Sequence, residues 1–286
     1  MNSLWKSLWY KLEKDELQAL VLPIKAFLQA QESSCVAACA RFLQRDVRDP
    51  IWLQVTEEGR ISGFIILSKG ILFPVFHEIP AVSLGDFMVQ GLRDLRFYAI
   101  NGIRHDVALL EQAFAVGGLF PANSVDYDLL VLDQEPAHLK SCLPGLSFRN
   151  PEPADHEALF RLQAAYEQEE VIPKGGVFNP AACRMSLERI IAHEHLLLAQ
   201  WKSQIIGKIN TNAASFSRYQ IGGVYVRPDY RGLGIASAMG AAFARDLLST
   251  GRGLTLFVKK QNHAARKVYL RIGFTVLEDY RISYYG

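Results

Sequence analysis

Few cysteines and no long hydrophobic run are found in this sequence, and both shortages narrow the class of protein. Only four of the 286 residues are cysteines, namely Cys35, Cys39, Cys142 and Cys183, too few for a disulfide framework in a chain of this length. We expect reduced thiols and a cytoplasmic location. No second Cys/His pair lies at zinc spacing, so we expect no metal site. No apolar run approaches the ~20 residues of a membrane span, and the N-terminal residues lack the long apolar core of a signal peptide.

The composition is otherwise that of an ordinary globular protein. Half of the residues are hydrophobic, which excludes collagen-like and disordered chains. The length predicts two domains. Residues 1–145 carry 13 basic and 17 acidic side chains, whereas residues 146–286 carry 18 basic and 12 acidic ones. This split is consistent with an anionic ligand in the second half. The basic residues are spread out without interleaved aromatics, so we expect no nucleic-acid partner.

Proline and glycine cluster between residues 133 and 153, and we expect a domain boundary there, giving domains 1–145 and 146–286. In the second domain, hydrophobic periodicity predicts alternating strands and helices, which is a mixed α/β (α+β) class. Strands are expected at 146–149, 196–201, 205–212, 220–226, 254–258 and from 274 onward, and helices at 154–167, 182–192, 235–248 and 264–271.

The first domain is less regular. Helices are expected at 15–30 and 33–45, and a hairpin at 51–68. The segment Ile61-Ser-Gly-Phe-Ile65 resembles Ile205-Ile-Gly-Lys-Ile209, which raises the hypothesis of an internal duplication. Near the N-terminus, apolar residues recur at an i, i+4 spacing that predicts a helix packed on the protein or lying on a membrane surface; they are Leu4, Trp5, Leu8, Trp9 and Leu12.

The stretch that carries chemistry is Gly222-Gly-Val-Tyr-Val-Arg-Pro-Asp-Tyr-Arg-Gly-Leu-Gly-Ile-Ala236. It predicts a strand that ends at Val226, a glycine-rich loop and the start of a helix. Unpaired amides and the dipole at a helix N-terminus favour an anion, and glycine lets the backbone approach a phosphate closely. The loop therefore predicts a site for a phosphate-bearing cofactor.

Two cofactor classes compete for this loop. Gly232-Leu-Gly-Ile-Ala-Ser237 matches part of the dinucleotide fingerprint, but Ser237 replaces its third glycine. The following strand ends in Lys259-Lys260, which would suit only a 2′-phosphate, so an NADP-dependent oxidoreductase is one alternative. The loop also lies too close to the C-terminus for a full dinucleotide-binding domain. No Walker pattern is present.

The other class fits better. Arg231-x-x-Gly234-x-Ala236 resembles the signature of the GNAT superfamily of acetyl-CoA-dependent N-acetyltransferases, and Asn262-His-Ala-Ala-Arg-Lys-Val-Tyr-Leu-Arg-Ile-Gly-Phe274 is similar to its late helical segment. The match covers about residues 219–274. The resemblance implies a GNAT fold in residues 146–286, with a mixed twisted sheet flanked by helices, and a degenerate copy of that fold in residues 1–145.

The resemblance also implies residue roles. The main chain of Val224 and Val226 would pair with the pantetheine arm, the amides from Arg231 to Ser237 would hold the pyrophosphate, and Tyr269 would be the general acid. Asn262 and Tyr269 lie seven residues apart, which places them on one helix face. The expected cofactor-binding residues are Val224, Tyr225, Val226, Arg231, Gly232, Leu233, Gly234, Ile235, Ala236, Ser237, Asn262 and Arg266.

The expected reaction is transfer of an acetyl group from acetyl-CoA to a primary amine by direct attack, at a single site in the second domain. Many family members carry a glutamate base on the fourth strand, but residues 219–226 contain none. Glu169, Glu170, His193 and His195 are candidates for the base, and Glu170 is our choice because the apolar Val-Ile-Pro follows it. The missing glutamate leaves a non-catalytic CoA-binding or interaction protein as a further alternative.

The first domain lacks such a loop. At the equivalent place it has Gly85-Asp-Phe-Met-Val-Gln-Gly-Leu92, and Asn101–Leu110 is only a weak counterpart of the late helix. We therefore expect this domain not to bind CoA and instead to shape the acceptor site or bind a partner.

Overall fold

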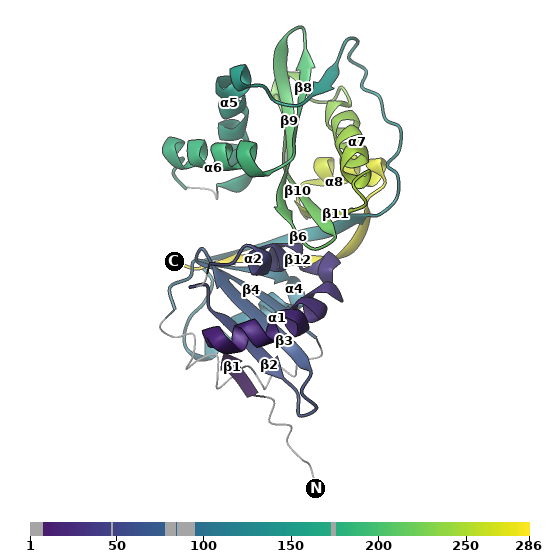
Figure 1. Cartoon of the computed structure of the whole chain (residues 1–286). Helices are drawn as coiled ribbons and strands as arrows, with labels where there is room; N and C mark the ends of the chain where they lie inside the picture. The colour runs from purple at the N-terminus through teal and green to yellow at the C-terminus, as the bar shows by residue number, and fades with distance from the viewer. Residues whose placement is uncertain (1–7, 47, 78–83, 85–94, 173–175) are drawn as a thin grey trace. The chain divides into compact units, whose positions relative to one another are not determined.

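The computed structural model describes residues 8–46, 48–77, 84, 95–172 and 176–286 (Figure 1). These residues form two compact units. Unit 1 comprises residues up to Leu129 together with Leu277–Gly286, and unit 2 comprises Leu130–Val276. This division differs from the expected 1–145 and 146–286 in two places: residues 130–145 belong to unit 2, and the C-terminal ten residues belong to unit 1.

Unit 1 contains the expected helices and hairpin. The N-terminal apolar stripe is different: Leu8–Lys11 is a strand that buries Trp9, while Leu4 and Trp5 lie outside the described residues. Its elements are β1 (Leu8–Lys11), α1 (Lys14–Gln29), α2 (Val36–Leu43), β2 (Ile51–Val55), β3 (Ile61–Ser68), β4 (Ile71–Phe76), β5 (Ala99–Ile103), α4 (Arg104–Val116) and the first part of β6 (Asn123–Leu132).

Unit 2 follows the expected order of strands and helices closely. A π-helical turn, Glu167–Val171, extends the first helix; we call it the acidic turn. The elements are β7 (Ser147–Arg149), α5 (His156–Tyr166), α6 (Pro180–His193), β8 (Leu196–Trp201), β9 (Gln204–Ala214), β10 (Arg218–Val226), α7 (Ile235–Leu248), β11 (Gly253–Lys259), α8 (His263–Ile272) and β12 (Thr275–Tyr284), whose last eight residues belong to unit 1.

Both units have the same sheet topology. In unit 1, β1 to β4 pair antiparallel in sequence order and β4 then pairs parallel with β5. In unit 2, β7 to β10 repeat the antiparallel run and β10 pairs parallel with β11. The segments at 61–65 and 205–209 fall in β3 and β9, which hold the same place in the two runs, as the duplication hypothesis predicts.

Each unit takes its last strand from the other half of the sequence. In unit 1, β12 pairs with β5, with Tyr280 opposite Ile103 and Tyr284 opposite Ala99. In unit 2, Leu130 and Leu132 of β6 belong to the hydrophobic core. Strand β6 ends the first repeat in sequence and β12 ends the second, so the two repeats exchange their terminal strands.

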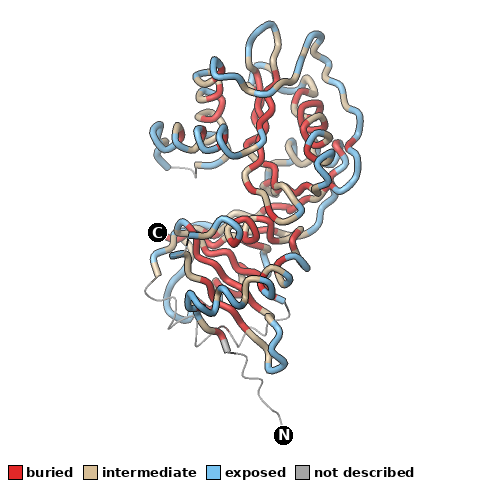
Figure 2. Tube along the Cα trace, viewed as in Figure 1, coloured by how far each residue is buried: buried red, intermediate tan, exposed pale blue. Residues whose placement is uncertain are grey.

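Burial is concentrated on the strands and on the inner face of α7 (Figure 2). The core of unit 2 packs the apolar face of α7 against the central strands, with Met239 and Ala244 of α7 and Ile206 and Leu254 of the sheet fully buried. The core of unit 1 packs α4 against its own strands. Across the described residues, no helix is long and apolar enough to cross a membrane.

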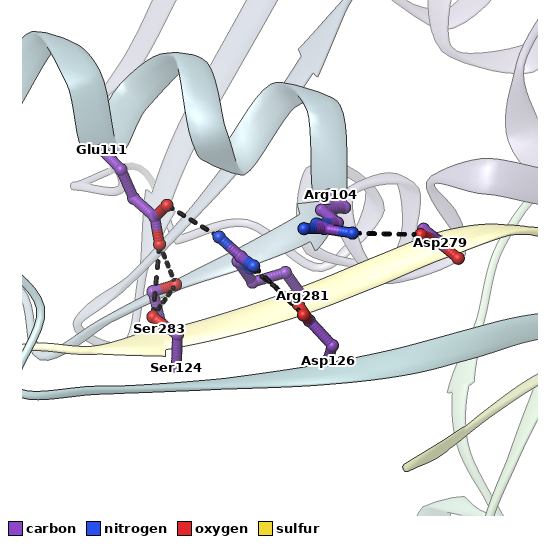
Figure 3. Close-up of polar contacts among 7 residues, drawn as sticks. All are labelled: Arg104, Glu111, Ser124, Asp126, Asp279, Arg281 and Ser283. Atoms are coloured by element: carbon purple, nitrogen blue, oxygen red, sulfur yellow. Dashed lines mark hydrogen bonds and ion pairs between the residues drawn. The ribbon is translucent and has the colours of Figure 1, made fainter. Parts of the chain in front are cut away.

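A polar network holds β12 in unit 1 (Figure 3). Arg281 Nε donates to Asp126 Oδ1 of β6 at 2.7 Å, and Arg281 Nη1 donates to Glu111 Oε2 of α4 at 3.0 Å. Ser283 also donates to Glu111 and lies 2.9 Å, oxygen to oxygen, from Ser124. Because Arg281 and Glu111 are each less than one-fifth exposed, this network fixes β12 to strand β6 and to helix α4.

Candidate functional site

A pocket of about 450 Å³ opens where β10 and β11 separate. The two strands pair from Arg218 with Gly253 to Ile221 with Leu256, and β10 then continues to Val226 without that partner. The separation leaves main-chain groups of β10 facing the cavity on the side where β11 would otherwise pair with them. The lining includes Val224, Tyr225, Val226, Arg231, Gly232, Gly234, Ile235, Ala236, Ser237, Asn262 and Tyr269, together with Glu169 and Glu170.

The glycine loop and the start of α7 form one wall of the pocket. Gly232 and Gly234 have φ angles of +80° and +74°, a left-handed conformation that glycine adopts without strain. No side chain caps α7, and its first helical hydrogen bond runs from Ala238 N to Gly234 O. The amides of the preceding turn therefore have no helical acceptor, which suits an anion. The Arg231 amide differs from the expectation, because it donates to Pro228 O.

The late helix α8 forms the opposite wall. The Asn262 side chain accepts a hydrogen bond from Ala265 N at 3.0 Å and so caps the helix as predicted. Gly273, with φ +120°, ends it. Two turns after Asn262, Tyr269 lines the same pocket. Burial raises the pKa of Tyr269, and the nearby Tyr166 and Glu170 raise it further. The phenol therefore keeps its proton at neutral pH.

The acidic turn reaches into the pocket. Glu169 Oε2 accepts from Arg231 Nη2 at 2.7 Å, and Glu169 Oε1 accepts from the Tyr225 hydroxyl at 2.7 Å. The pKa of Glu169 is lowered, because burial, which opposes ionisation, is outweighed by these two hydrogen bonds. Arg231 Nε also donates to Val226 O at 2.9 Å. The arginine of the loop motif thus contacts a carboxylate and the end of β10.

Glu170, our choice for the base, faces the late helix. Its Oε1 accepts from Asn262 Nδ2 at 3.3 Å, and its Oε2 lies 3.4 Å from Lys259 Nζ. Both contacts stabilise the carboxylate. His193 is exposed and the His195 ring packs against Tyr219; neither residue is among those that line the pocket.

Two of the expected cofactor residues lie off the described pocket lining, Leu233 and Arg266. Leu233 packs on the core instead. Three residues that sequence reasoning did not single out lie beside the pocket strand: Tyr166, Lys208 and Asn210. For Lys208 and Asn210 the signal was the Lys-x-Asn spacing on a strand, which puts both side chains on one face. Among the described residues, no group of three or more His, Cys, Asp or Glu could hold a metal ion.

The corresponding opening in unit 1 is nearly filled. Strands β4 and β5 pair only at Ile71 with Ala99 and Leu72 with Ile100, but the space beyond them measures about 10 Å³. Asp106 of α4 lies there, buried, and accepts from Phe76 N at 2.9 Å. The Asp106 carboxylate thus accepts the hydrogen bond of the main-chain amide at the end of β4, and this amide is not free for a ligand. The segment 85–92 lies outside the described residues.

Comparisons with known proteins agree with this geometry. Residues 157–274 match the family model of the acetyltransferase (GNAT) family. A GNAT-family acetyltransferase from Colwellia psychrerythraea superposes with a TM-score of 0.62 at 13% identity, over 98% of this chain and 100% of that one. A GCN5-related N-acetyltransferase from Sphaerobacter thermophilus gives a TM-score of 0.64 at 19% identity, over 98% and 95%. No curated protein sequence matches the chain.

The duplication has a counterpart among solved structures. A tandem GNAT protein of the clavulanic acid biosynthesis pathway superposes with a TM-score of 0.58 at 12% identity, over 97% of each chain. These likenesses span both units and define the fold of each as that of GNAT proteins. Residues 157–274 thus match the GNAT family model, and both units have the GNAT fold.

Proposed function

We propose that unit 2 transfers an acetyl group from acetyl-CoA to a primary amine, and that it is the only unit that does so. The observation that carries this proposal is the pocket between β10 and β11, where strand main chain, an uncapped helix start, Asn262 and Tyr269 line one cavity. The family supports acyl transfer; acetyl as the acyl group and an amine as the acceptor are our inferences.

The residues of the pocket fit CoA. The uncapped turn at Ile235–Ser237 and the two left-handed glycines suit its pyrophosphate. The end of β10 that extends beyond its pairing with β11, Val224–Val226, suits the amides of the pantetheine arm, because it offers main-chain groups in extended form. Arg231 and Lys259 would complement the negative charge once their contacts with Glu169 and Glu170 give way.

Acetyl-CoA supplies an activated acyl group that a neutral amine can attack directly. Tyr269 holds its proton at neutral pH and would give it to the departing sulfur. A main-chain amide near Val226 would stabilise the charge that develops on the carbonyl oxygen. Glu170 would take up the proton of the attacking amine, directly or through water, since an alkylammonium with a pKa near 10 must first lose a proton.

We infer that unit 1 does not bind CoA, because Asp106 occupies the Phe76 amide and the space beside it is too small. It would shape the acceptor site or bind a partner. All four cysteines are free thiols, which supports a reducing, cytoplasmic compartment.

The test is acetyl-CoA consumption against a broad panel of amines, followed as thiol release, with binding measured by calorimetry. We expect acetyl-CoA binding and release with at least one amine. Tight binding without release for any amine would favour a non-catalytic CoA-binding protein, and binding of NADPH alone would contradict the proposal.

A further inference from the structure

Lys208, in the middle of β9, is fully buried. Its Nζ donates to Asn210 Oδ1 at 2.8 Å and to the Gly223 carbonyl oxygen at 2.9 Å. The ammonium also lies over the ring of Tyr166, 5.1 Å from its centroid. The charged group of this lysine is therefore surrounded by partners from β9, β10 and α5 and has no exposure to solvent.

Gly223 is built around this lysine. The pairing of β10 with β9 shifts register between Gly222 and Tyr225, and Gly223 has a left-handed φ of +57°. A Cβ at Gly223 would lie 2.8 Å from Lys208 Nζ and would overlap Asn210 Oδ1. The bulge thus requires glycine for its conformation and for the room that Lys208 and Asn210 need.

The backbone of Gly223 also forms a hydrogen bond with the Tyr166 hydroxyl. Burial raises the pKa of Tyr166 to about 12, so this hydroxyl stays neutral. The next residues along the chain, Val224 to Val226, line the pocket opposite Tyr269. Whatever fixes Gly223 therefore fixes the start of the pocket strand.

Keeping a lysine at this position is costly for the fold. Burial lowers the pKa of Lys208 to about 7, with Glu167 of the acidic turn and Cys183 of α6 opposing that shift. Replacing buried charged groups by apolar residues of similar volume is often neutral or stabilising. Stability alone therefore does not account for an ammonium beside the pocket strand.

We propose, on the basis of the acyl-transfer function above, that Lys208 is a positioning residue that holds the Gly223 carbonyl and so sets the course of Val224–Val226 for the acyl donor. The lysine acts through the strand and need not touch either substrate. Its loss moves the reacting end of the pocket more than the phosphate-binding loop, which belongs to the start of α7.

The experiment compares Lys208→Met with Lys202→Met, which removes an exposed lysine from the turn before β9. For each variant, calorimetry gives the acetyl-CoA dissociation constant, thiol release with a reactive amine gives kcat and KM, and hydrogen exchange follows residues 218–226. We expect Lys208→Met to lower kcat at least tenfold, because misplacement by about 1 Å can cost 10²-fold, to change acetyl-CoA binding by less than about threefold, and to speed exchange at Gly223–Val226. Lys202→Met should leave all three unchanged.

A folded Lys208→Met variant with wild-type kcat and wild-type exchange would overturn the positioning role. If Lys208→Met does not fold, Gly223→Ala disturbs the same contact from the strand side and is expected to have the same effects; wild-type kcat and exchange in Gly223→Ala would overturn it as well. A wild-type protein that neither binds acetyl-CoA nor releases thiol would refute the proposed function and, with it, this role. Binding without turnover in the wild type would refute the transfer function, whereas turnover by the wild type with unchanged kcat and exchange in Lys208→Met would overturn the positioning role alone.

Discussion

Glu169 and Arg231 lie 62 residues apart in sequence, yet their side chains meet at 2.7 Å inside the pocket. Arg231 is the first residue of the glycine-loop motif, so the cation expected to favour an anionic ligand already has a carboxylate partner. Both side chains are 40 to 48% exposed, and pairs of this kind are worth only about 0.2–1 kcal/mol. An anionic ligand can therefore displace Glu169 at small cost.

Glu169→Gln is expected to tighten CoA binding about fivefold, because it removes a negative charge from the pocket and releases Arg231. Calorimetry with CoA at low and at physiological salt measures the effect, which should shrink as salt rises. Glu157→Gln, at an exposed residue paired with Arg184, is the matched control. Weaker CoA binding in Glu169→Gln would mean that the carboxylate assists the ligand.

Tyr269→Phe is expected to lower kcat about 10²-fold with little change in CoA affinity, because only the proton donor is lost. The packing of the ring against Phe274 remains. Thiol release and calorimetry separate the two effects. Tyr219→Phe, on β10 but outside the described pocket lining, should behave as wild type, and an unchanged kcat in Tyr269→Phe would exclude the acid role.

Asp106→Asn is expected to stabilise the protein at pH 8 but not at pH 4. Burial raises the pKa of Asp106 to about 6, against the lowering effect of His105 and the Phe76 amide. Because this pKa lies above the unfolded value of about 4, the contribution of Asp106 to the free energy of unfolding is fully present below pH 4 and is lost as the pH rises through 6. The loss is on the order of 3 kcal/mol.

Urea unfolding of Asp106→Asn at several pH values checks this, with the exposed Asp246→Asn as a control. The stability difference between Asp106→Asn and wild type should grow from pH 4 to pH 8. Parallel pH profiles for the two proteins would contradict the prediction.

Arg281→Met is expected to destabilise unit 1 by about 2 kcal/mol, because it leaves Glu111 and Asp126 without their shared cation (Figure 3). Arg104→Met, which removes a separate ion pair of unit 1, is the matched control. The Arg104–Asp279 pair is 3.4 Å long and nearly half exposed on both sides, so its loss should change the unfolding free energy by less than about 0.5 kcal/mol. Equal losses of unfolding free energy in Arg281→Met and Arg104→Met would show that burial of the ion pair does not determine its contribution to stability.

Local chemistry explains what the sequence could predict. The Asn262 cap, the end of α8 at Gly273 and the glycine-loop start of α7 depend on neighbours within a few residues, and each is found as expected. Contacts between elements that are distant in sequence leave no local pattern from which they could be predicted. Glu169 with Arg231 depends on how the acidic turn crosses β10, and Lys208 with Gly223 depends on the register of β9 against β10.

The predicted domain boundary near residue 145 did not include the exchange of strands, for a related reason. The apolar pattern of β6 or β12 is compatible with pairing to either β5 or β11. The pattern therefore does not predict which strand is the neighbour. The pairing of β5 with β12 in unit 1 and of β6 with β11 in unit 2 is seen only in the strand order of the folded sheet.

This exchange makes the two halves of the polypeptide poor candidates for separate expression. A fragment of residues 1–145 would lack the strand that covers β5, and a fragment of residues 146–286 would lack Leu130 and Leu132 from its core. Each would leave one edge of a central strand, β5 or β11, without its partner, and such an edge is a template for aggregation. The two halves should therefore be insoluble alone and recover solubility when they are produced together in one cell.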